Sequence, residues 1–84
     1  MEPGTITAVS FGTLQGVYRP QARVYYRNAK YGVCFETITK PLRCKSRAIA
    51  VKLAKEWIKT EEFDTLLNGV LLKISENPDN EVGR

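Results

Sequence analysis

The sequence predicts an α+β domain in which a three-stranded antiparallel sheet packs on an amphipathic helix and a second helix follows, in the order β-β-β-α-α. The first half holds three β-branched and aromatic segments separated by glycine, proline and asparagine, which is typical of strands. In the second half the apolar residues recur every three or four positions, which is the period of an α-helix. A chain of 84 residues suits one small domain and excludes two lobes with a cleft between them.

The first strand is predicted over residues 5–11 (TITAVSF), which are rich in β-branched and aromatic residues. Gly4 and Gly12 bound this segment on its two sides. Gly12, Gly16 and Pro20 then interrupt the pattern, and glycine and proline are the strongest signals for turns and loops. We therefore expect a connection between the first and second strands, with Val17 and Tyr18 as candidates to extend a strand edge.

The second and third strands are predicted to form a hairpin from residues 22–27 (ARVYYR) and 31–39 (YGVCFETIT). Asn28-Ala29-Lys30 between them has the length of a hairpin turn, and asparagine tolerates unusual backbone angles. Lys40-Pro41 is expected to end the third strand, because proline cannot donate to a strand ladder and restricts the residue before it.

Two helices are expected after the sheet. From Ser46 to Lys59 the apolar residues share one helical face, and Ser46 is suited to cap the N-terminus. The second helix starts at Thr60 or Glu61, and acidic residues in its first turn suit the helix dipole. Asn77-Pro78-Asp79 ends it, so we expect one domain over residues 1–76 and a flexible tail over residues 77–84. The apolar residues of the two helices are Ile49, Ala50, Leu53, Ala54, Trp57 and Ile58, then Phe63, Leu66, Leu67, Val70, Leu71 and Ile74.

The packing of the second helix is left open by the sequence. The first helix is expected to bury Ile49, Leu53 and Trp57 against the sheet. The second either packs on the first or offers its leucine-rich stripe to a homodimer or to a protein partner. The residues expected in such a contact are Phe63, Leu66, Leu67, Val70 and Leu71.

The composition favours binding over catalysis. Apolar residues make up 43% and charged residues 26% of the chain, which is ordinary for a globular protein. No apolar run approaches the roughly 20 residues that span a bilayer, and no signal peptide opens the chain, so a cytoplasmic protein is expected. Histidine is absent, and neither a phosphate-binding glycine loop nor a nucleophile beside a base is found. We expect no enzymatic activity and no cofactor.

The two cysteines, Cys34 and Cys44, do not suggest a metal site. They are too far apart for a CxxC pair, and no histidine could complete a zinc site. A disulfide between them is sterically conceivable. The strand pattern around Cys34 favours a buried free thiol.

Charge is distributed unevenly along the chain. Residues 1–60 hold eleven basic and three acidic side chains, a net charge of +8, whereas residues 61–84 carry a net charge of −4. A positive field over the first two thirds attracts polyanions such as nucleic acid. The alternative is that these lysines and arginines only solvate the surface of a small domain.

A row of basic and aromatic residues lies on the second strand. Strand alternation sends Arg23, Tyr25 and Arg27 to one face and Val24 and Tyr26 to the other. Under this hypothesis, Val24 and Tyr26 join a core under the helix together with Tyr31, Val33 and Phe35. The opposite face then presents two guanidinium groups and a phenol ring, which can bind phosphates and base edges. The alternative is that Arg23 and Arg27 only solvate an exposed face.

A second basic element is predicted where the first helix begins, with Arg43, Lys45 and Arg47. Backbone amides at a helix N-terminus and nearby cations together bind phosphate. Lys52, Lys55 and Lys59 continue along the solvent side of this helix, where they could equally be a solvated face. Lys30, in the hairpin turn, is the remaining candidate for nucleic-acid contact.

Residues 22–59 resemble the arm-binding, AP2-like DNA-binding domains at the N-termini of phage-type tyrosine recombinases. The shared features are the basic and aromatic hairpin, the basic turn, and the helix with Ser46, Ala48, Ala54 and Trp57. The resemblance implies that the sheet lies in the major groove, with Arg23, Tyr25 and Arg27 facing bases. It also implies that Lys45 and Arg47 touch phosphates, and that the protein is a phage or mobile-element regulator. A recombinase carries further domains, so a free-standing accessory protein or a fragment is expected.

Two alternatives remain. The stretch Lys45-Ser46-Arg47-Ala48 is similar to the helix start of double-stranded-RNA-binding domains, although that family has a helix before its sheet. A protein-interaction or inhibitor module, acting through the second helix, is the other alternative. Duplex DNA is the preferred partner.

Overall fold

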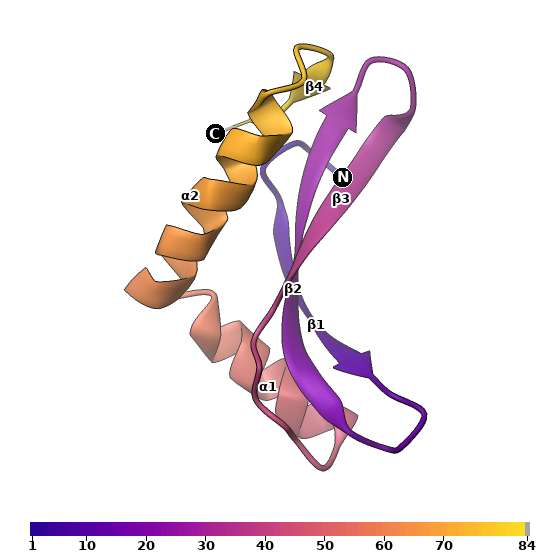
Figure 1. Ribbon diagram of the computed structural model, residues 1–84, viewed down its shortest axis with the longest axis vertical. Helices are drawn as coiled ribbons and strands as arrows, with labels where there is room; N and C mark the ends of the chain where they lie inside the picture. Colours follow the sequence, from indigo (N-terminus) through magenta and orange to yellow (C-terminus); the bar gives the residue numbers. More distant parts are fainter. Residues whose placement is uncertain (84) are drawn as a thin grey trace.

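A computed structural model describes residues 1–83 and confirms the predicted α+β class (Figure 1). Three strands come first, two helices follow, and a short fourth strand comes last. The elements are β1 (Ile6–Gly12), β2 (Tyr18–Asn28), β3 (Gly32–Thr39), α1 (Arg47–Trp57), α2 (Glu61–Ser75) and β4 (Asn80–Glu81).

The sheet is antiparallel and is built around β2, the longest strand. Its order is β1-β2-β3, and β4 pairs with the far end of β2. The register places Val24 opposite Ile6 on one side, and Tyr25 opposite Phe35 on the other. Asn28 fixes the hairpin turn, because its side-chain oxygen accepts hydrogen bonds from the backbone N–H groups of Lys30 (2.8 Å) and Tyr31 (3.0 Å).

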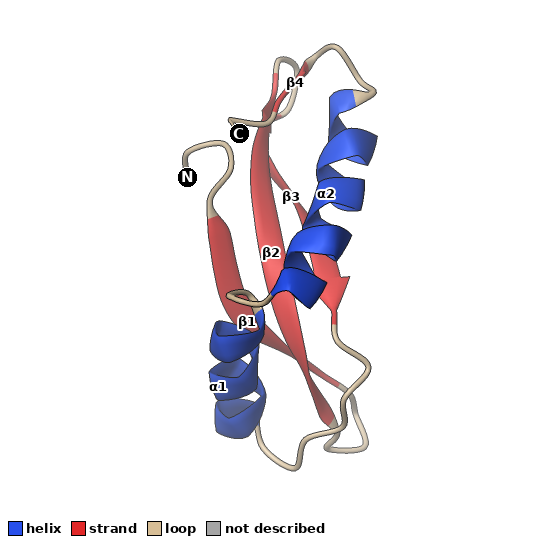
Figure 2. Ribbon diagram, turned by 90° about the vertical axis from the view of Figure 1, so that its left-hand side faces the viewer, coloured by secondary structure: helices blue, strands red, loops and turns tan. Residues whose placement is uncertain are grey.

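Both helices lie on the same face of the sheet (Figure 2). They follow one another along the long axis of the molecule, α1 against β1 and β2 and α2 further towards β4. The buried core lies between the helices and this face, and the other face of the sheet is uncovered. The core residues are Ala22, Val24, Ile38, Trp57, Phe63, Leu67 and Ile74.

Capping residues set where the helices begin. Ser46 caps α1, as predicted, by accepting a hydrogen bond from the N–H of Ile49 at 3.2 Å. Thr60 accepts from the N–H of Phe63 at 3.3 Å, while its hydroxyl donates to the carbonyl of Trp57 at 2.6 Å. The Thr60 side chain thus caps the end of α1 and the start of α2. The chain changes direction at this joint between the two helices.

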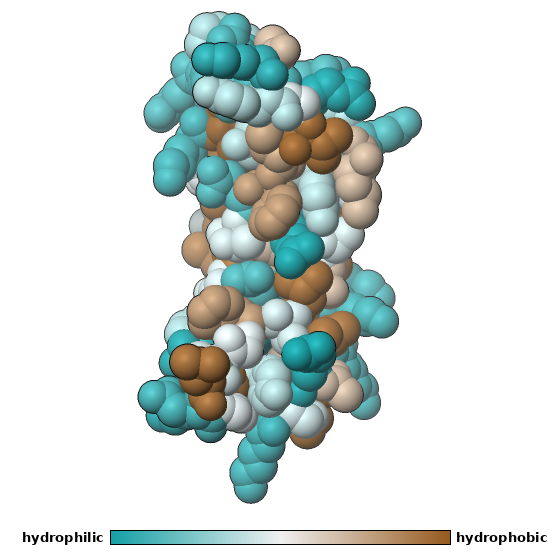
Figure 3. All heavy atoms as spheres, turned by 90° about the vertical axis from the view of Figure 1, so that its right-hand side faces the viewer, coloured by the Kyte–Doolittle hydropathy of each residue, from teal (hydrophilic) through white to brown (hydrophobic). Residues whose placement is uncertain are grey.

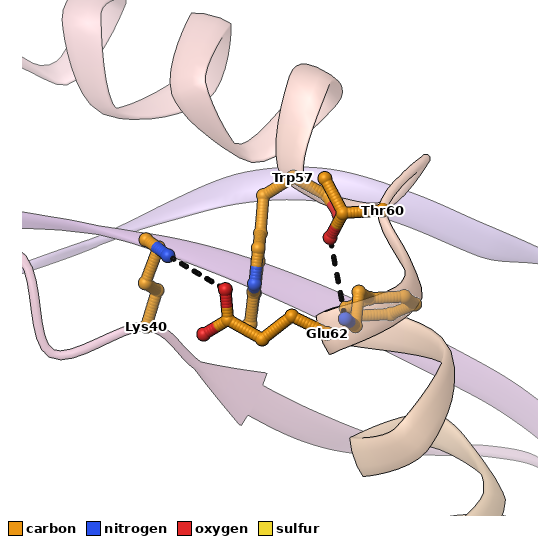
Figure 4. A network of polar contacts seen from close by, with 5 residues as sticks. Lys40, Trp57, Thr60 and Glu62 are labelled. Atoms are coloured by element: carbon orange, nitrogen blue, oxygen red, sulfur yellow. Dashed lines mark hydrogen bonds and ion pairs between the residues drawn. The ribbon is translucent and has the colours of Figure 1, made fainter.

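The joint between the helices is also an aromatic and ionic contact with the end of the sheet. The rings of Trp57 and Phe63 meet edge to face, with centroids 4.9 Å apart. Lys40, just after β3, pairs with Glu62 at 3.6 Å and lies 5.6 Å from the Trp57 ring centroid (Figure 4). Both helices are therefore tied to the end of β3 at one place.

The structure corrects the predicted core on β3. Tyr31, Val33 and Phe35 were expected under the helix, but Val33 and Phe35 lie on the uncovered side and are 50% and 45% exposed, and Tyr31 is in the hairpin turn and is 73% exposed. The pairing of Tyr25 with Phe35 sets this outcome, because residues opposite one another share a face. Cys34, Glu36 and Ile38 are therefore the β3 residues that face the helices.

The predictions for the helix faces are wrong in part. Ile49 was expected in the core but is 49% exposed. On α2, Phe63 and Leu67 are buried, and Val70 and Leu71 pack partly against the core. Of the two alternatives left open for this stripe, the structure shows packing inside the chain, and only Leu66 of the set is exposed.

The segment predicted to be a flexible tail holds β4. Arg27 pairs with Glu81, and Asn28 with Asn80. The side chain of Asn80 accepts from the Asn28 amide at 2.8 Å and donates to the carbonyl of Ile74 at 2.8 Å. This residue therefore joins the end of α2 to the hairpin. Neither helix of the described chain is long and apolar enough to cross a membrane.

The variant Asn80→Ala tests whether β4 is part of the cooperative fold. It leaves the buried Asn28 amide without its acceptor, so we expect a loss of about 1 to 3 kcal/mol in the free energy of unfolding. Urea unfolding followed by circular dichroism measures this loss. Asn68→Ala, on an exposed position of α2, is the control. Equal stability of the two variants would show that β4 contributes nothing.

Candidate nucleic-acid interface

The uncovered face of the sheet carries a row of arginines on its middle strand. Because Val24 is in the core, its neighbours Arg23 and Tyr25 point to the opposite side. The same alternation adds residues at both ends of the strand, so that an arginine recurs at every fourth position. The row is Arg19, Gln21, Arg23, Tyr25 and Arg27.

The flanking strands contribute hydroxyl and apolar side chains to this face (Figure 3). Cross-strand pairing places Thr7 and Thr37 on either side of Arg23. Phe11, which is exposed, lies opposite Arg19. In Figure 3 hydrophobic and hydrophilic side chains accordingly alternate over the surface. We call this surface, from β1, β2 and β3, the open face.

An aromatic pair occupies the centre of the open face. The rings of Tyr25 and Phe35 are tilted by 53°, with centroids 5.5 Å apart. The guanidinium carbon of Arg23 lies 4.7 Å from the Phe35 ring centroid. Its Nε is buried and has no hydrogen-bond partner in the described chain. Phe35 thus holds the guanidinium in place, which lowers the entropy that Arg23 loses when it binds a ligand.

The other predicted contact residues lie at the two ends of the molecule. Lys30 is in the hairpin turn, where its amine lies 5.2 Å from the Tyr31 ring centroid. Arg43 and Lys45 flank Cys44, which pairs with Tyr18 at the start of β2. Arg47 is the first residue of α1. All four side chains are exposed, but the structure does not gather them with the central row.

Sequence reasoning missed two residues of the open face. Phe35 was assigned to the core, and Arg19 was not considered because Pro20 was expected to lie in a connection. Arg19 shares its side of the strand with Arg23 and Arg27, so extending the alternation back past Pro20 would have found it. No local signal identifies Phe35, because its face depends on the register of the hairpin.

The open face has a single acidic neighbour among the described strands. Glu36 of β3 shares its face with Val24, on the helix side. Glu81 of β4 lies directly opposite Arg27, at the end of the arginine row. It is placed to compete with an anionic ligand for this guanidinium.

The described residues hold no group of three potential metal ligands. Both cysteines are free, Cys44 being buried and Cys34 half-buried on the helix side.

Burial raises the pKa of Tyr26, and neighbouring Cys34 and Glu36 raise it further. The Tyr26 phenol is therefore uncharged near neutral pH. It lies on the helix side of the sheet, opposite Cys34.

Comparisons with protein-family models, curated proteins and solved structures find no match. The resemblance to recombinase DNA-binding domains accordingly remains a hypothesis.

The contact between Arg23 and Phe35 can be tested without a ligand. We expect the Nε–H proton of Arg23 to exchange with water more slowly than that of exposed Arg27, because it is buried. Phe35→Ala should remove this difference, whereas Val33→Ala, on the same face, should preserve it. Exchange rates from NMR of arginine side chains provide the measurement. Equal rates for both arginines in the unmodified protein would contradict the described packing.

Proposed function

We propose that this protein binds duplex DNA through the open face of its sheet. The observation that carries the proposal is the row of three arginines on the middle strand, uncovered by any other element of the described chain. Consecutive arginines of the row are four residues apart, which corresponds to about 13 Å along a strand. The row therefore extends a line of positive charge along the sheet.

The chemistry of this row suits nucleic acid better than other anions. Arginine donates two parallel hydrogen bonds to phosphates or to the edge of guanine. The aromatic side chains and exposed Thr37 beside Arg23 can contact sugars and thymine methyl groups. The hydroxyl of Thr7 is buried. Because the Phe35 ring packs against the Arg23 guanidinium, the terminal nitrogens of Arg23 are already positioned to donate hydrogen bonds.

The shape of the sheet favours DNA over duplex RNA. The major groove of B-DNA is about 12 Å wide and admits a β-ribbon. The major groove of A-form RNA is deep and too narrow for side chains to read. The ribbon of β2 and β3 therefore finds an accessible major groove only on the DNA duplex.

The basic residues at the start of α1 would position the protein on the phosphate backbone. Arg43, Lys45 and Arg47 lie near the end of β2 that carries Arg19. Contacts of this kind contribute affinity without reading sequence. A role as a regulator of a phage or mobile element is the corresponding biological proposal, which the recombinase resemblance suggests.

Removing two arginines of the row tests the proposal directly. We expect Arg23→Gln with Arg27→Gln to weaken duplex DNA binding at least tenfold, and to lower the slope of log affinity against log salt by about 2. Lys55→Gln with Lys59→Gln removes the same charge from the helix side and is the matched control. Fluorescence anisotropy with labelled duplex DNA and duplex RNA measures all three proteins.

Equal losses in the two double variants would indicate attraction by net charge alone and would overturn the assignment to the open face. Tighter binding of duplex RNA than of DNA would replace the proposed ligand by RNA. Absence of binding to both duplexes at low salt would remove the nucleic-acid function altogether.

The variant Glu81→Gln tests the acidic neighbour of the row. Opposite charges across a pair of strands interact by roughly 0.2 to 1 kcal/mol. Removing the negative charge opposite Arg27 should therefore tighten duplex binding by up to about fivefold. Glu56→Gln, which makes the same charge change on α1, is the control. The same gain in both variants would show that the position of Glu81 is irrelevant.

A further inference from the structure

The outer surface of the two helices carries two patches of opposite charge. On α1 the side chains that point away from the sheet are mainly lysines, and on α2 they are mainly acidic or small. We call these surfaces the basic patch and the acidic patch. The basic patch is Ala48, Ile49, Lys52, Lys55, Glu56 and Lys59, with Glu56 as its one acidic side chain, and the acidic patch is Glu61, Thr65, Gly69, Leu72 and Glu76.

These charges are not neutralised inside the chain. Residues 41–60 hold six basic and one acidic side chain, whereas residues 61–83 hold one basic and six acidic side chains. The ion pair found among the described residues joins Lys40 to Glu62, and Lys40 lies outside both patches. Because α1 and α2 follow one another along the long axis, one molecule cannot bring its two patches face to face.

Each patch also contains an exposed apolar residue. Ile49 in the basic patch is 49% exposed, and Leu72 in the acidic patch is 68% exposed. A groove beside Leu72 is lined by Asn68, Leu71, Ser75 and Val82 as well. Both patches therefore have an apolar contact to offer in addition to their charges.

Gly69 marks the middle of the acidic patch. A glycine inside a helix costs about 1 kcal/mol relative to alanine. A Cβ at this position would meet nothing within 4 Å, so packing inside the chain does not require glycine here. Close approach of another helix is a physical reason for a missing side chain, and Ala48 is the small residue of the basic patch.

We propose that a second copy of this chain packs on the helix layer, with its long axis reversed. A twofold axis in the plane of the layer, perpendicular to the line that joins the centres of α1 and α2, brings the basic patch of each copy onto the acidic patch of the other. Both contacts form at once, so the interface closes into a dimer. The charge complementarity of the patches identifies a second copy as the occupant.

The arrangement fixes where the open faces lie. The helix layers meet in the middle, and the two sheets form the outside of a four-layer assembly. The two open faces then point in opposite directions. If the proposed function holds, on which this step alone rests, one dimer binds two separate duplex segments and joins them.

The oligomeric state without nucleic acid tests the dimer separately from DNA binding. We expect sedimentation velocity of the unmodified chain to show a monomer–dimer equilibrium. Its dissociation constant should rise at least tenfold between about 50 and 500 mM salt, because complementary charges are screened. A monomer at every concentration up to about 0.5 mM at low salt would overturn the proposal.

Charge exchange tests the reversed orientation. Lys52→Glu with Lys55→Glu should abolish the dimer, and so should Glu61→Lys with Glu76→Lys. An equimolar mixture of the two variants should restore it, because one contact is then unmodified and the other has its charges exchanged. Circular dichroism shows whether each variant is folded, and the salt series on the unmodified chain does not depend on them. A mixture that stays monomeric, or single variants that stay dimeric, would contradict the proposed orientation.

Discussion

The alternation of side chains along β2 is the constraint on which the rest of the structure depends. Because β2 has partners along both edges, its register is held from two sides, and a slip by one residue would exchange its faces. The register places Ala22 and Val24 under the helices and leaves Arg23, Tyr25 and Arg27 outside. Core and candidate binding surface are thus two sides of the same eleven-residue strand.

Because the helices cover only one side of the sheet, the two outer surfaces of the molecule carry different side chains. The helices take up the apolar side chains and turn their own charges outward, whereas the other side of the sheet keeps arginine, threonine and aromatic residues. Glu81 is the exception, since it lies beside Arg27 at the edge of the open face. The molecule therefore has two surfaces of different composition, to which the proposed DNA contact and the proposed dimer contact are assigned.

Local patterns were sufficient to predict the order of strands and helices, including the Ser46 cap. They were insufficient for β3, because both of its faces carry apolar residues and only the hairpin register decides between Phe35 and Ile38. They also missed the start of β2. Pro20 looked like a break, yet its carbonyl accepts from the N–H of Lys40, just beyond the end of β3. The N–H that proline lacks would point the same way in an antiparallel strand, so it falls outside the ladder with β3. β4 was missed because its two residues depend on Asn28, 52 positions away.

The joint between α1 and α2 gives the protein an optical reporter of its own. Trp57 is the only tryptophan of the chain. It is buried against Phe63 and lies near the amine of Lys40. Indole emission depends on such surroundings, so its wavelength and quenching report how the two helices are held together. A ligand on the far side of the sheet does not contact these neighbours. A change in the intrinsic fluorescence on binding would therefore indicate that binding alters the helix joint through the sheet.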